Sequence, residues 1–443
     1  MKITKFYDDY SQSALYQSFR SIANYIDGQK PSSRKILYTV DKNNINSKIK
    51  VAQLMSKVAE QTQYLHGEAA LHGTIVGLAT DYVGANNINL LEPSGNFGCR
   101  FIPHPAAARY IFTNKSKYFD NIIKKEDFAI LISQEFEGDI IEPKYFVPII
   151  PLILVNGSEG IGNGFSQLIL PRNPKELIKE IRHYLKNSKY KCKSILPWYK
   201  GFTGKIEKNK ETGGIEIYGS YDQPNTYVIN IKDLPIGTDL NSYLHVLNRL
   251  MDNKIIKGFE DNSENDIFSF KIQTYREFGK KDEEKIVSSL RLINKTTENF
   301  TCIDEDNKIV EFGNEVELLE AYIKVRLEYY SKRKKHILGK LDREIEVLKS
   351  RARFIKAVID EEVIINNKTK DYIEKEIIKI KDIIKIEDSY DYLLKMSIYV
   401  LTKEKYELLK EEIKKKKEEI DELKKTSIED LWIKELDVLD KII

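Results

Sequence analysis

The feature that most constrains the fold is a pair of long, highly charged segments in the last third of the sequence. From residue 315 onward, and again over residues 402–425, apolar residues recur at intervals of three and four. That spacing places them on one side of an α-helix. A narrow apolar stripe on a charged background favours two antiparallel coiled-coil helices over an ordinary helical bundle, with a globular insert near residues 352–400. The stripe positions are Leu318, Tyr322, Val325, Tyr329, Leu338, Leu341, Ile345 and Leu348 in the first helix and Tyr406, Leu409, Ile413, Ile420 and Leu423 in the second.

The middle of the chain has a different pattern. Residues 145–155 are apolar, β-branched and interrupted by proline, and they lead into a glycine-rich stretch at 156–164. From about 200 to 310, short segments of alternating polarity, such as 214–218 and 227–231, are separated by turn residues. Alternation with a period of two is typical of half-buried strands. We therefore predict an α+β region that contains an antiparallel sheet.

The first 110 residues combine short helices with positive charge. Helical patterns over 11–40 and 51–79 are broken by tight turns, and Pro31 suits the first turn of a helix because its φ is fixed. These 110 residues hold 12 Lys and Arg against 8 Asp and Glu, whereas the rest of the chain holds 59 against 60. The positive excess therefore lies entirely here. A basic helical region is compatible with a winged-helix or helix-turn-helix module, and chance clustering of charge is the alternative.

Cysteine use and hydropathy bear on the compartment. Cys99, Cys192 and Cys302 are odd in number, far apart and in no metal-ligand spacing, so free thiols in a reducing compartment are the simplest account. No stretch reaches the roughly 20 apolar residues of a membrane span, and the first residues lack the apolar core of a signal peptide. We expect an intracellular chain, in the cytoplasm or nucleoid of a phage-infected bacterial cell or in a virus-infected host cell. The richness in Lys, Ile and Asn fits a viral, AT-rich genome.

The segment Ala106-Ala-Ala-Arg-Tyr110 is the strongest candidate for chemistry. A tyrosine phenol has a pKa near ~10. To attack a phosphodiester it needs a base, or neighbours that favour the phenolate, and cations that neutralise the transition state. Arg109 is permanently charged and can fork onto phosphate oxygens, and the small alanines would let the backbone approach DNA closely. By itself, however, an Arg-Tyr pair is most often an ordinary surface feature.

Other polar residues could support such a reaction only if the fold brings them together. His66 lies beside a glycine turn, and Arg20, Lys30, Arg34 and Lys35 are clustered cations on short predicted helices. A single histidine is more often structural than catalytic. Two other groups must therefore converge on His66 before a catalytic role becomes credible.

Short motifs extend in order through nearly the whole chain. They are Arg20-Ser-Ile, Asp27-Gly-Gln-Lys-Pro31, Arg34-Lys-Ile-Leu37, Tyr64-Leu-His-Gly-Glu68, Gly73-Thr-Ile-Val-Gly77, Gly95-Asn-Phe-Gly98, Ala106-Ala-Ala-Arg-Tyr110, Asn156-Gly-Ser-Glu-Gly-Ile-Gly-Asn-Gly164, Pro197-Trp-Tyr-Lys-Gly-Phe-Thr-Gly204, Val325-Arg-Leu-Glu-Tyr-Tyr330, Tyr390-Asp-Tyr-Leu-Leu-Lys-Met396, Leu401-Thr-Lys-Glu-Lys-Tyr406 and Asp430-Leu-Trp432. Taken together they resemble the type IIA DNA topoisomerases. Their details are closer to the eukaryotic enzyme and to the medium subunit of T-even phage topoisomerases than to bacterial gyrase.

The resemblance implies roles for the residues around Tyr110. Tyr110 would form the covalent 5′-phosphotyrosine link, and Arg109 would stabilise the transition state beside it, with Arg20 as a second contributor. His66 would hydrogen-bond near the scissile phosphate. Family members often have a second histidine where this chain has Leu65, so the role of that position does not carry over.

Four further residues are implied to bind DNA. Lys30, Arg34 and Lys35 would grip the backbone beside the cleavage site. Ile161, in the glycine-rich stretch, would wedge between bases, since an inserted apolar side chain unstacks a base step and kinks the duplex. The alternative for Ile161 is a buried anchor of its loop.

The resemblance also implies an α+β multidomain architecture. A winged-helix domain that carries Tyr110 would cover residues 1–148, and an α/β tower that carries Ile161 would cover 149–310. A coiled-coil arm with a helical dimerisation tip would cover 311–443. Two copies would form a C2 homodimer whose two tyrosines face opposite DNA strands.

The implied activity is that of the DNA-breakage and rejoining subunit of an ATP-dependent type II DNA topoisomerase. It would relax or decatenate DNA through a transient double-strand break. No acidic cluster of the Glu plus Asp-x-Asp type that binds Mg²⁺ in this family is visible. We expect no ATP-binding domain before residue 1. We therefore predict no metal site on this chain and expect Mg²⁺ and ATP to be bound mainly by a partner subunit.

Two other classes of protein are alternatives. A non-catalytic DNA-bridging protein could be built on the same coiled-coil arm, and Tyr110 would then be dispensable. A tyrosine recombinase or type IB enzyme carries its tyrosine near the C-terminus. The early position of Tyr110 argues against that class.

Overall fold

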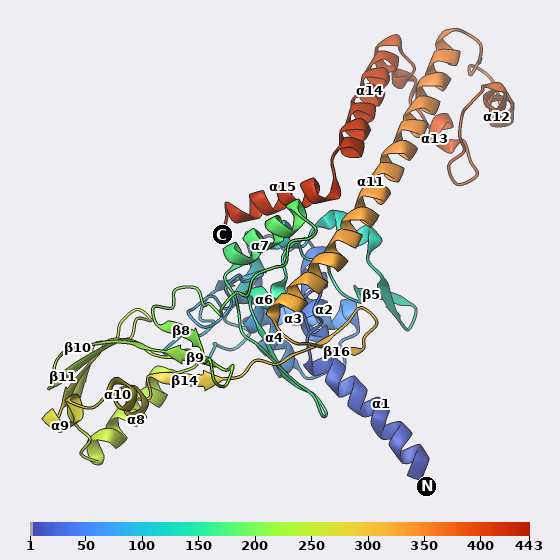
Figure 1. Ribbon diagram of the computed structural model, residues 1–443. Coiled ribbons are helices and arrows are strands. Elements are labelled where there is room, and N and C mark those ends of the chain that lie inside the picture. Colours follow the sequence, from blue (N-terminus) through green and yellow to red (C-terminus); the bar gives the residue numbers. More distant parts are fainter. Residues whose placement is uncertain (1–2) are drawn as a thin grey trace. The chain divides into compact units, whose positions relative to one another are not determined.

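The computed structural model describes residues 3–443, which form two compact units (Figure 1). The first unit comprises the chain up to Arg326 together with Ile433–Ile443, and the second comprises Leu327–Trp432. Within the described chain, no helix combines the length and the apolarity that crossing a bilayer requires. Mixed helix and antiparallel sheet confirm the α+β class predicted from the sequence.

The N-terminal part of the first unit contains four helices and a small sheet. Pro31 occupies the first turn of its helix, as its fixed φ predicts. The helical pattern over 51–79 forms two helices rather than one, because Gln63 adopts a left-handed conformation with φ 49° that ends the first of them. The helices are α1 (Ile3–Ser21), α2 (Pro31–Lys42), α3 (Val51–Thr62) and α4 (Glu68–Ala79), and the antiparallel strands, in sheet order, are β1 (Ile49–Lys50), β3 (Phe112–Lys115) and β2 (Leu91–Ser94).

Residues 145–155, the apolar segment interrupted by proline, form a buried support for the site. Its short helix α6 (Leu152–Val155) is entirely buried, and the glycine-rich stretch after it forms the hairpin β6–β7. The bounds of the hairpin strands are β6 (Ser158–Ile161) and β7 (Ser166–Ile169). The surrounding elements are α5 (Phe119–Ile122), the 3-10 helix η1 (Lys125–Ile130), the hairpin β4 (Ser133–Phe136) and β5 (Asp139–Pro143), α7 (Pro174–Lys186), the hairpin β15 (Phe300–Ile303) and β16 (Ile309–Phe312), and α15 (Ile428–Asp440).

The antiparallel sheet predicted between residues 200 and 310 is present as a four-stranded sheet with an apolar core of its own. Inward positions such as Ile229, Ile231, Phe270 and Ile272 alternate with outward polar residues, as a one-sided sheet requires. Its strands, in sheet order, are β10 (Ser220–Asn225), β11 (Val228–Asp233), β13 (Phe270–Thr274) and β12 (Ile256–Asp261). It is accompanied by α8 (Leu240–Asp252), α9 (Arg276–Gly279), α10 (Glu283–Ser289) and a second sheet of β14 (Ile293–Thr296), β9 (Ile215–Tyr218) and β8 (Lys205–Lys208).

The two long helices predicted from the charged segments are confirmed as α11 (Glu315–Ile359) and α14 (Lys403–Lys425). In the second unit they pack along the predicted stripe, with Leu341 and Ile345 of α11 in one buried cluster with Ile420 of α14. Figure 1 shows them side by side, with the intervening segment folded next to α11. That segment contains α12 (Lys370–Lys379), α13 (Asp391–Leu394) and the 3-10 helix η2 (Ile398–Val400).

The seam between these helices supplies a first prediction. Ile420 is buried against α11, whereas Leu408 on the same helix is 57% exposed. Replacing Ile420 by Ala should lower the free energy of unfolding of the second unit by roughly 2–5 kcal/mol, because it removes buried methyl groups and leaves a cavity. The matched Leu408→Ala change should cost within about 0.5 kcal/mol. Urea unfolding followed by helical circular dichroism measures both, and equal losses would contradict the packing described here.

Candidate active site

Tyr110 lies on a turn immediately before strand β3, and its side chain is 65% exposed. The turn is held by backbone contacts. The Tyr110 N–H donates to the Ala107 carbonyl at 2.9 Å, while the N–H groups of Val51 and Ala52 donate to the carbonyls of Ile111 and Ala108 at 3.0 and 3.2 Å. The first N–H groups of a helix have no partner within the helix. The N–H groups at the start of α3 therefore find their acceptors in the chain on both sides of Tyr110. These hydrogen bonds fix the turn that presents Tyr110.

The loop that leads to Tyr110 folds back on itself at two glycines. Gly95 has φ +103°, and a Cβ there would lie 3.2 Å from Cγ2 of Ile111. Gly98 has φ +87°, and a Cβ there would lie 3.1 Å from the carbonyl carbon of Pro103. A side chain at either position would combine a strained backbone with a close contact. The glycines therefore let the loop close tightly behind the exposed tyrosine.

Arg109 and His66 line one cavity of about 610 Å³ beside this turn. Small residues, including Ala52, Ala107 and Ala108, form much of its wall. The guanidinium carbon of Arg109 lies 5.0 Å from the centre of the Tyr110 ring, within cation–π range. The structure thus brings the predicted nucleophile, its neighbouring cation and the predicted histidine into one region.

His66 is held in a polar and aromatic environment. Its Nε2 lies 3.2 Å from the Tyr16 hydroxyl, and its ring meets Tyr64 edge-on at 5.4 Å. Burial lowers the pKa of His66 below its usual value of 6.5, and the positive charges of Arg20 and Lys35 lower that pKa further. The neutral imidazole is therefore favoured. It can donate one hydrogen bond and accept another.

Arg20 and Lys30 line a second cavity, of about 520 Å³, together with residues 156–159 of the glycine-rich segment. The Lys30 ammonium donates to the Glu159 carbonyl at 2.7 Å, which ties the start of α2 to strand β6. Burial lowers the pKa of Lys30, and the nearby Glu159 opposes that change. Arg20 is exposed and its guanidinium lies over the Tyr16 ring at 5.7 Å.

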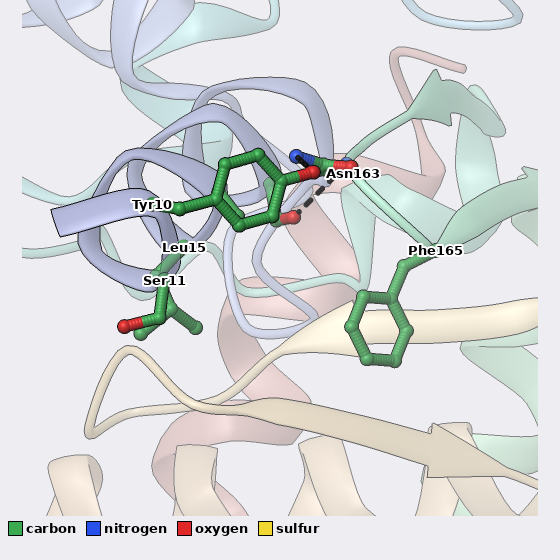
Figure 2. A pocket seen from close by; sticks show the side chains of 7 residues that line it. Tyr10, Ser11, Leu15, Asn163 and Phe165 are labelled. Atoms are coloured by element: carbon green, nitrogen blue, oxygen red, sulfur yellow. Dashed lines mark hydrogen bonds between the residues drawn. The ribbon is translucent and has the colours of Figure 1, made fainter. Parts of the chain in front are cut away.

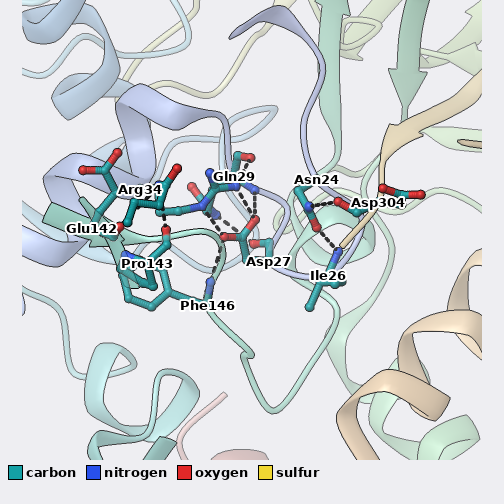
Figure 3. A network of polar contacts seen from close by, with 10 residues as sticks. Asn24, Ile26, Asp27, Gln29, Arg34, Glu142, Pro143, Phe146 and Asp304 are labelled. Atoms are coloured by element: carbon teal, nitrogen blue, oxygen red, sulfur yellow. Dashed lines mark hydrogen bonds and ion pairs between the residues drawn. The ribbon is translucent and has the colours of Figure 1, made fainter. Parts of the chain in front are cut away.

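The sequence interpretation expected Arg34 to contact the DNA backbone, but the structure buries its side chain. Its side chain is 2% exposed, and its Nε and Nη2 donate to the two carboxylate oxygens of Asp27 at 2.8 and 3.2 Å. Asp27 also accepts from the N–H groups of Gln29 and Phe146, so its carboxylate joins three segments (Figure 3). A guanidinium that is buried in a two-bond pair with a carboxylate is not available to grip a DNA backbone. We therefore correct the expectation for Arg34 and assign it a structural role.

Lys35 is also engaged within the protein. Its ammonium donates to the Thr62 carbonyl at 2.6 Å and to Glu142 at 3.0 Å, and the Glu142 side chain is 4% exposed. The carboxylate offsets much of the lysine charge. The link joins α2 to the end of α3 and to strand β5, so Lys35 holds together the helices that carry the site.

Ile161 is the last residue of strand β6 and pairs with Ser166 of β7. Its side chain is 79% exposed, which excludes the alternative of a buried anchor. The glycines on either side of it lie against α1: a Cβ at Gly160 would be 1.9 Å from the Ser21 carbonyl, and one at Gly162 would be 2.9 Å from Ser18. These glycines therefore allow the hairpin to sit on the helix with Ile161 projecting from it.

Two hydrogen bonds secure the hairpin turn. The Asn163 N–H donates to the Ser18 hydroxyl at 3.2 Å, and the Asn163 amide donates to the Tyr10 hydroxyl at 3.2 Å. Figure 2 shows Tyr10 and Asn163 meeting in this way, with Phe165 on the other side of a shallow cavity of about 570 Å³. The hairpin is thus anchored on α1 through its turn.

Sequence reasoning missed the residues that support the site. Asp27, Glu142 and Tyr16 make the decisive contacts with Arg34, Lys35 and His66. Asp27 and Arg34 are only seven positions apart, so their pairing could have been suspected. Glu142 is 107 positions from Lys35, and no pattern in one sequence connects them. Among the side chains that the structure describes, no three of His, Cys, Asp or Glu are arranged to hold a metal ion.

The model of the family formed by the A-type subunits of DNA gyrase and topoisomerase IV matches residues 20–437. The chain belongs to this family. The resemblance to type IIA topoisomerases that the ordered motifs suggested is therefore confirmed. The chain is also similar to full-length family members from diverse organisms.

It is 35% identical to DNA topoisomerase 2 of Plasmodium falciparum, over 100% of this chain and 35% of that protein. It is 33% identical to DNA topoisomerase 2 of Saccharomyces cerevisiae, over 96% and 33% of the two chains. It is 32% identical to DNA topoisomerase 2 of Acanthamoeba polyphaga mimivirus, over 94% and 39%. The chain thus spans about a third of the length of the curated relatives it matches.

A solved structure supports the same conclusion. The "topoisomerase II DNA-binding, cleavage and re-ligation domain" of Plasmodium falciparum superposes with a TM-score of 0.89 at 36% identity. The match covers 98% of this chain and 63% of that one. The fold of this chain is therefore that of a known family member over almost its entire length.

The surroundings of His66 supply a second prediction. Because Arg20 is one of the charges that lower the pKa of His66, Arg20→Gln should move that pKa back up toward 6.5. The pH titration of the His66 ring by NMR measures this directly. Lys271→Gln, which removes one charge from the four-stranded sheet, is the control and should leave the titration unchanged. A midpoint at or above 6.5 in the unaltered protein would contradict the environment described here.

Proposed function

We propose that this chain breaks and rejoins DNA as part of an ATP-dependent type II topoisomerase, with Tyr110 as its nucleophile. The observation that carries the proposal is the presentation of Tyr110. The tyrosine is exposed on a turn that α3 fixes from both sides, next to Arg109 and beside the cavity that His66 lines. Membership of the family supports the same activity.

The proposed reaction exchanges one ester bond for another. The Tyr110 oxygen attacks a backbone phosphorus, and the bond from that phosphorus to the 3′ oxygen breaks. The phenol proton is lost, the leaving 3′ oxygen is protonated, and the 5′ phosphate remains on the tyrosine. Because a phosphate ester replaces a phosphate ester, the free energy of the broken bond is conserved. The reverse attack by the 3′ hydroxyl then rejoins the strand without nucleotide hydrolysis.

Three nearby side chains are proposed to assist. Arg109 would form hydrogen bonds to the charged oxygens of the five-coordinate phosphorus, since guanidinium geometry suits phosphate. Arg20 would add a second positive charge from the neighbouring cavity. Neutral His66 would donate to a phosphate oxygen, a role that fits its lowered pKa.

The proposed DNA contacts differ from the sequence expectation in two residues, Arg34 and Lys35. Lys30 remains a proposed backbone contact, because it lines the same cavity as Arg20. Lys35 is proposed to act mainly by lowering the pKa of His66, since its ammonium is held by the Thr62 carbonyl and by Glu142. Ile161 is proposed as the wedge that kinks the duplex, because an exposed isoleucine on an anchored hairpin is suited to insert between base pairs.

The predicted division into a winged-helix domain (1–148), a tower (149–310) and a coiled-coil arm (311–443) is retained as a proposal. The arm is proposed to dimerise through its tip as part of a C2 homodimer. Apolar side chains exposed in the second unit support dimerisation, because exposed apolar surface often marks a protein–protein contact. They include Ile364, Ile378 and Tyr399, the last of which is 92% exposed.

Mg²⁺ and ATP are proposed to be bound mainly by a separate chain or domain, and the enzyme is proposed to act inside a cell. The relatives that this chain matches are about three times its length, which leaves room for those functions elsewhere. When bound, Mg²⁺ would supply further positive charge at the reacting phosphate. The residues of this chain would supply the nucleophile, Arg109, Arg20 and the bend in the duplex.

Tyr110→Phe tests the proposal directly. The variant should abolish protein-linked, cleaved plasmid when the chain is mixed with its ATPase and metal-binding partner, Mg²⁺ and supercoiled DNA and then quenched with detergent. It removes the attacking oxygen and leaves the ring in place. Tyr64→Phe is the control, because Tyr64 lines the same cavity and its buried hydroxyl has no hydrogen-bond partner within residues 3–443. The control should cleave as the unaltered chain does.

The outcomes separate the proposal from its rival. Linear DNA that persists with Tyr110→Phe would place the nucleophile elsewhere. DNA binding without cleavage by any of the three proteins would favour a bridging protein over an enzyme.

Ile161→Ala tests the wedge. The bend in a bound duplex, measured by energy transfer between dyes at its ends, should fall. The cleaved fraction should fall on the order of tenfold, because about 1.4 kcal/mol less stabilisation of the bent duplex is a factor of ten. Ile267→Ala, at a residue 66% exposed outside the site, is the control. An unchanged bend with Ile161→Ala would show that another residue bends the DNA.

A further inference from the structure

Tyr16 of α1 is an exposed tyrosine whose hydroxyl reaches the side chain of His66. The Tyr16 side chain is 53% exposed, and its hydroxyl lies 3.2 Å from Nε2 of His66, a residue 50 positions further along the chain. Among the described residues, this is the one hydrogen bond to the His66 ring. Tyr16 therefore occupies one nitrogen of the imidazole, and the other nitrogen, Nδ1, is left for a ligand.

A positive charge lies next to the Tyr16 ring. The guanidinium carbon of Arg20 is 5.7 Å from the centre of that ring, on the next turn of the same helix. A cation beside a phenol favours the donor role of its hydroxyl, because donation leaves negative charge on the oxygen. The same cation favours a nitrogen lone pair over an N–H on the side of His66 that faces Tyr16. Both effects make Tyr16 the donor and Nε2 the acceptor.

The helix that carries Tyr16 is fixed relative to the site. The Asn163 N–H donates to the Ser18 hydroxyl at 3.2 Å, and a Cβ at Gly160 would lie 1.9 Å from the Ser21 carbonyl. The hairpin β6–β7 therefore rests on α1 just beyond Tyr16. On His66 itself, the ring of Tyr64 packs edge-on at 5.4 Å. The hydrogen bond from Tyr16 thus reaches an imidazole that is already held in place.

The charged groups around His66 come from four parts of the chain. Arg20 of α1 and Lys35 of α2 lower the pKa of His66 in addition to its burial, and Glu68 of α4 and Arg109 line the same cavity as the imidazole. The ring is therefore neutral near pH 7, and a neutral imidazole carries one N–H. The nitrogen that holds this proton is the one that can donate to a ligand.

We infer that Tyr16 is a positioning residue whose hydroxyl donates to Nε2 of His66 and keeps the proton of the neutral ring on Nδ1. The inference rests on the proposed function, in which His66 donates to a phosphate oxygen of the DNA. The oxygens of a backbone phosphate accept hydrogen bonds and do not donate them. His66 serves that phosphate only through the nitrogen that carries the proton. Tyr16 makes this nitrogen Nδ1, and it acts on the reaction through His66.

The tautomer of His66 is measured on the full chain without DNA. The side-chain nitrogen signals of ¹⁵N-labelled protein distinguish a protonated Nδ1 from a protonated Nε2, and the His66→Gln variant identifies which signals belong to His66. The unaltered chain should carry the proton on Nδ1. Tyr16→Phe should lose this preference, because it removes the hydroxyl and keeps the ring under Arg20. A proton on Nε2 in the unaltered chain, or an unchanged tautomer in Tyr16→Phe, would overturn the inference.

Cleavage gives a second readout, in the presence of the ATPase and metal-binding partner and Mg²⁺. Tyr16→Phe should slow a single round of cleavage roughly fivefold at neutral pH, the effect of losing one ordinary hydrogen bond, and should leave the affinity for the duplex unchanged. The defect should disappear below the pKa of His66, because the imidazolium carries an N–H on both nitrogens. The ratio of the two rates is therefore followed between about pH 5 and pH 8. A defect of equal size at every pH would show a merely structural role.

Two further variants sharpen the test. Adding Tyr16→Phe to His66→Gln should slow cleavage no further, because Tyr16 acts through His66, whereas additive losses would contradict the inference. Tyr372→Phe is the matched control. Tyr372 is 40% exposed and its ring is also faced by a cation, Lys368 at 4.9 Å, but it lies in the second unit. This change should leave both the tautomer and the cleavage rate unaltered.

The proposed function can fail separately. If the unaltered chain with its partner does not cleave DNA through Tyr110, the enzyme assignment fails, whatever the tautomer of His66. If the unaltered chain cleaves DNA and Tyr16→Phe cleaves equally fast at every pH, only the role of Tyr16 fails.

Discussion

The buried carboxylate of Asp27 holds the site together. It accepts hydrogen bonds from two nitrogens of Arg34 and from the backbone of Gln29 and Phe146, so α2, the turn before it and the chain after β5 meet at one point. Removing one partner of such a buried pair costs roughly 3–5 kcal/mol, because the other charge is left uncompensated. The Asp27 carboxylate therefore fixes the turn that carries Lys30 relative to the helix that carries Lys35. The geometry around His66 depends on this fixed arrangement.

The second constraint is steric. Gly157 and Gly160 lie so close to neighbouring carbonyl oxygens that a Cβ would be 2.5 Å or less from them. Their hairpin can therefore rest directly on α1 and on the chain after β7, and Ile161 projects as a consequence of that contact. An exposed isoleucine is unfavourable in water. The anchored hairpin keeps it exposed, which is the arrangement that a wedge for DNA requires.

The sequence predicted the features that depend on local pattern. The long helices follow from the spacing of residues such as Leu341, Ile345 and Ile420, and the antiparallel sheet follows from alternation at residues such as Ile229 and Ile231. Tyr110 was proposed as the nucleophile because its neighbours form a short ordered motif. Arg34 was assigned wrongly, because a sequence shows a charge but not whether a carboxylate buries it. The pairing of Lys35 with Glu142 depends on the tertiary fold and has no local signal.

The central claim is that Tyr110 becomes covalently joined to DNA, and one measurement tests it most directly. The chain would be trapped on cleaved plasmid in the presence of its partner and Mg²⁺, the DNA digested, and the protein fragments analysed by mass spectrometry. The account predicts a nucleotide remnant on the peptide that contains Tyr110 and on no other. A remnant on a peptide that contains Tyr16 or Tyr64 instead, or cleaved DNA with no attached protein, would contradict it.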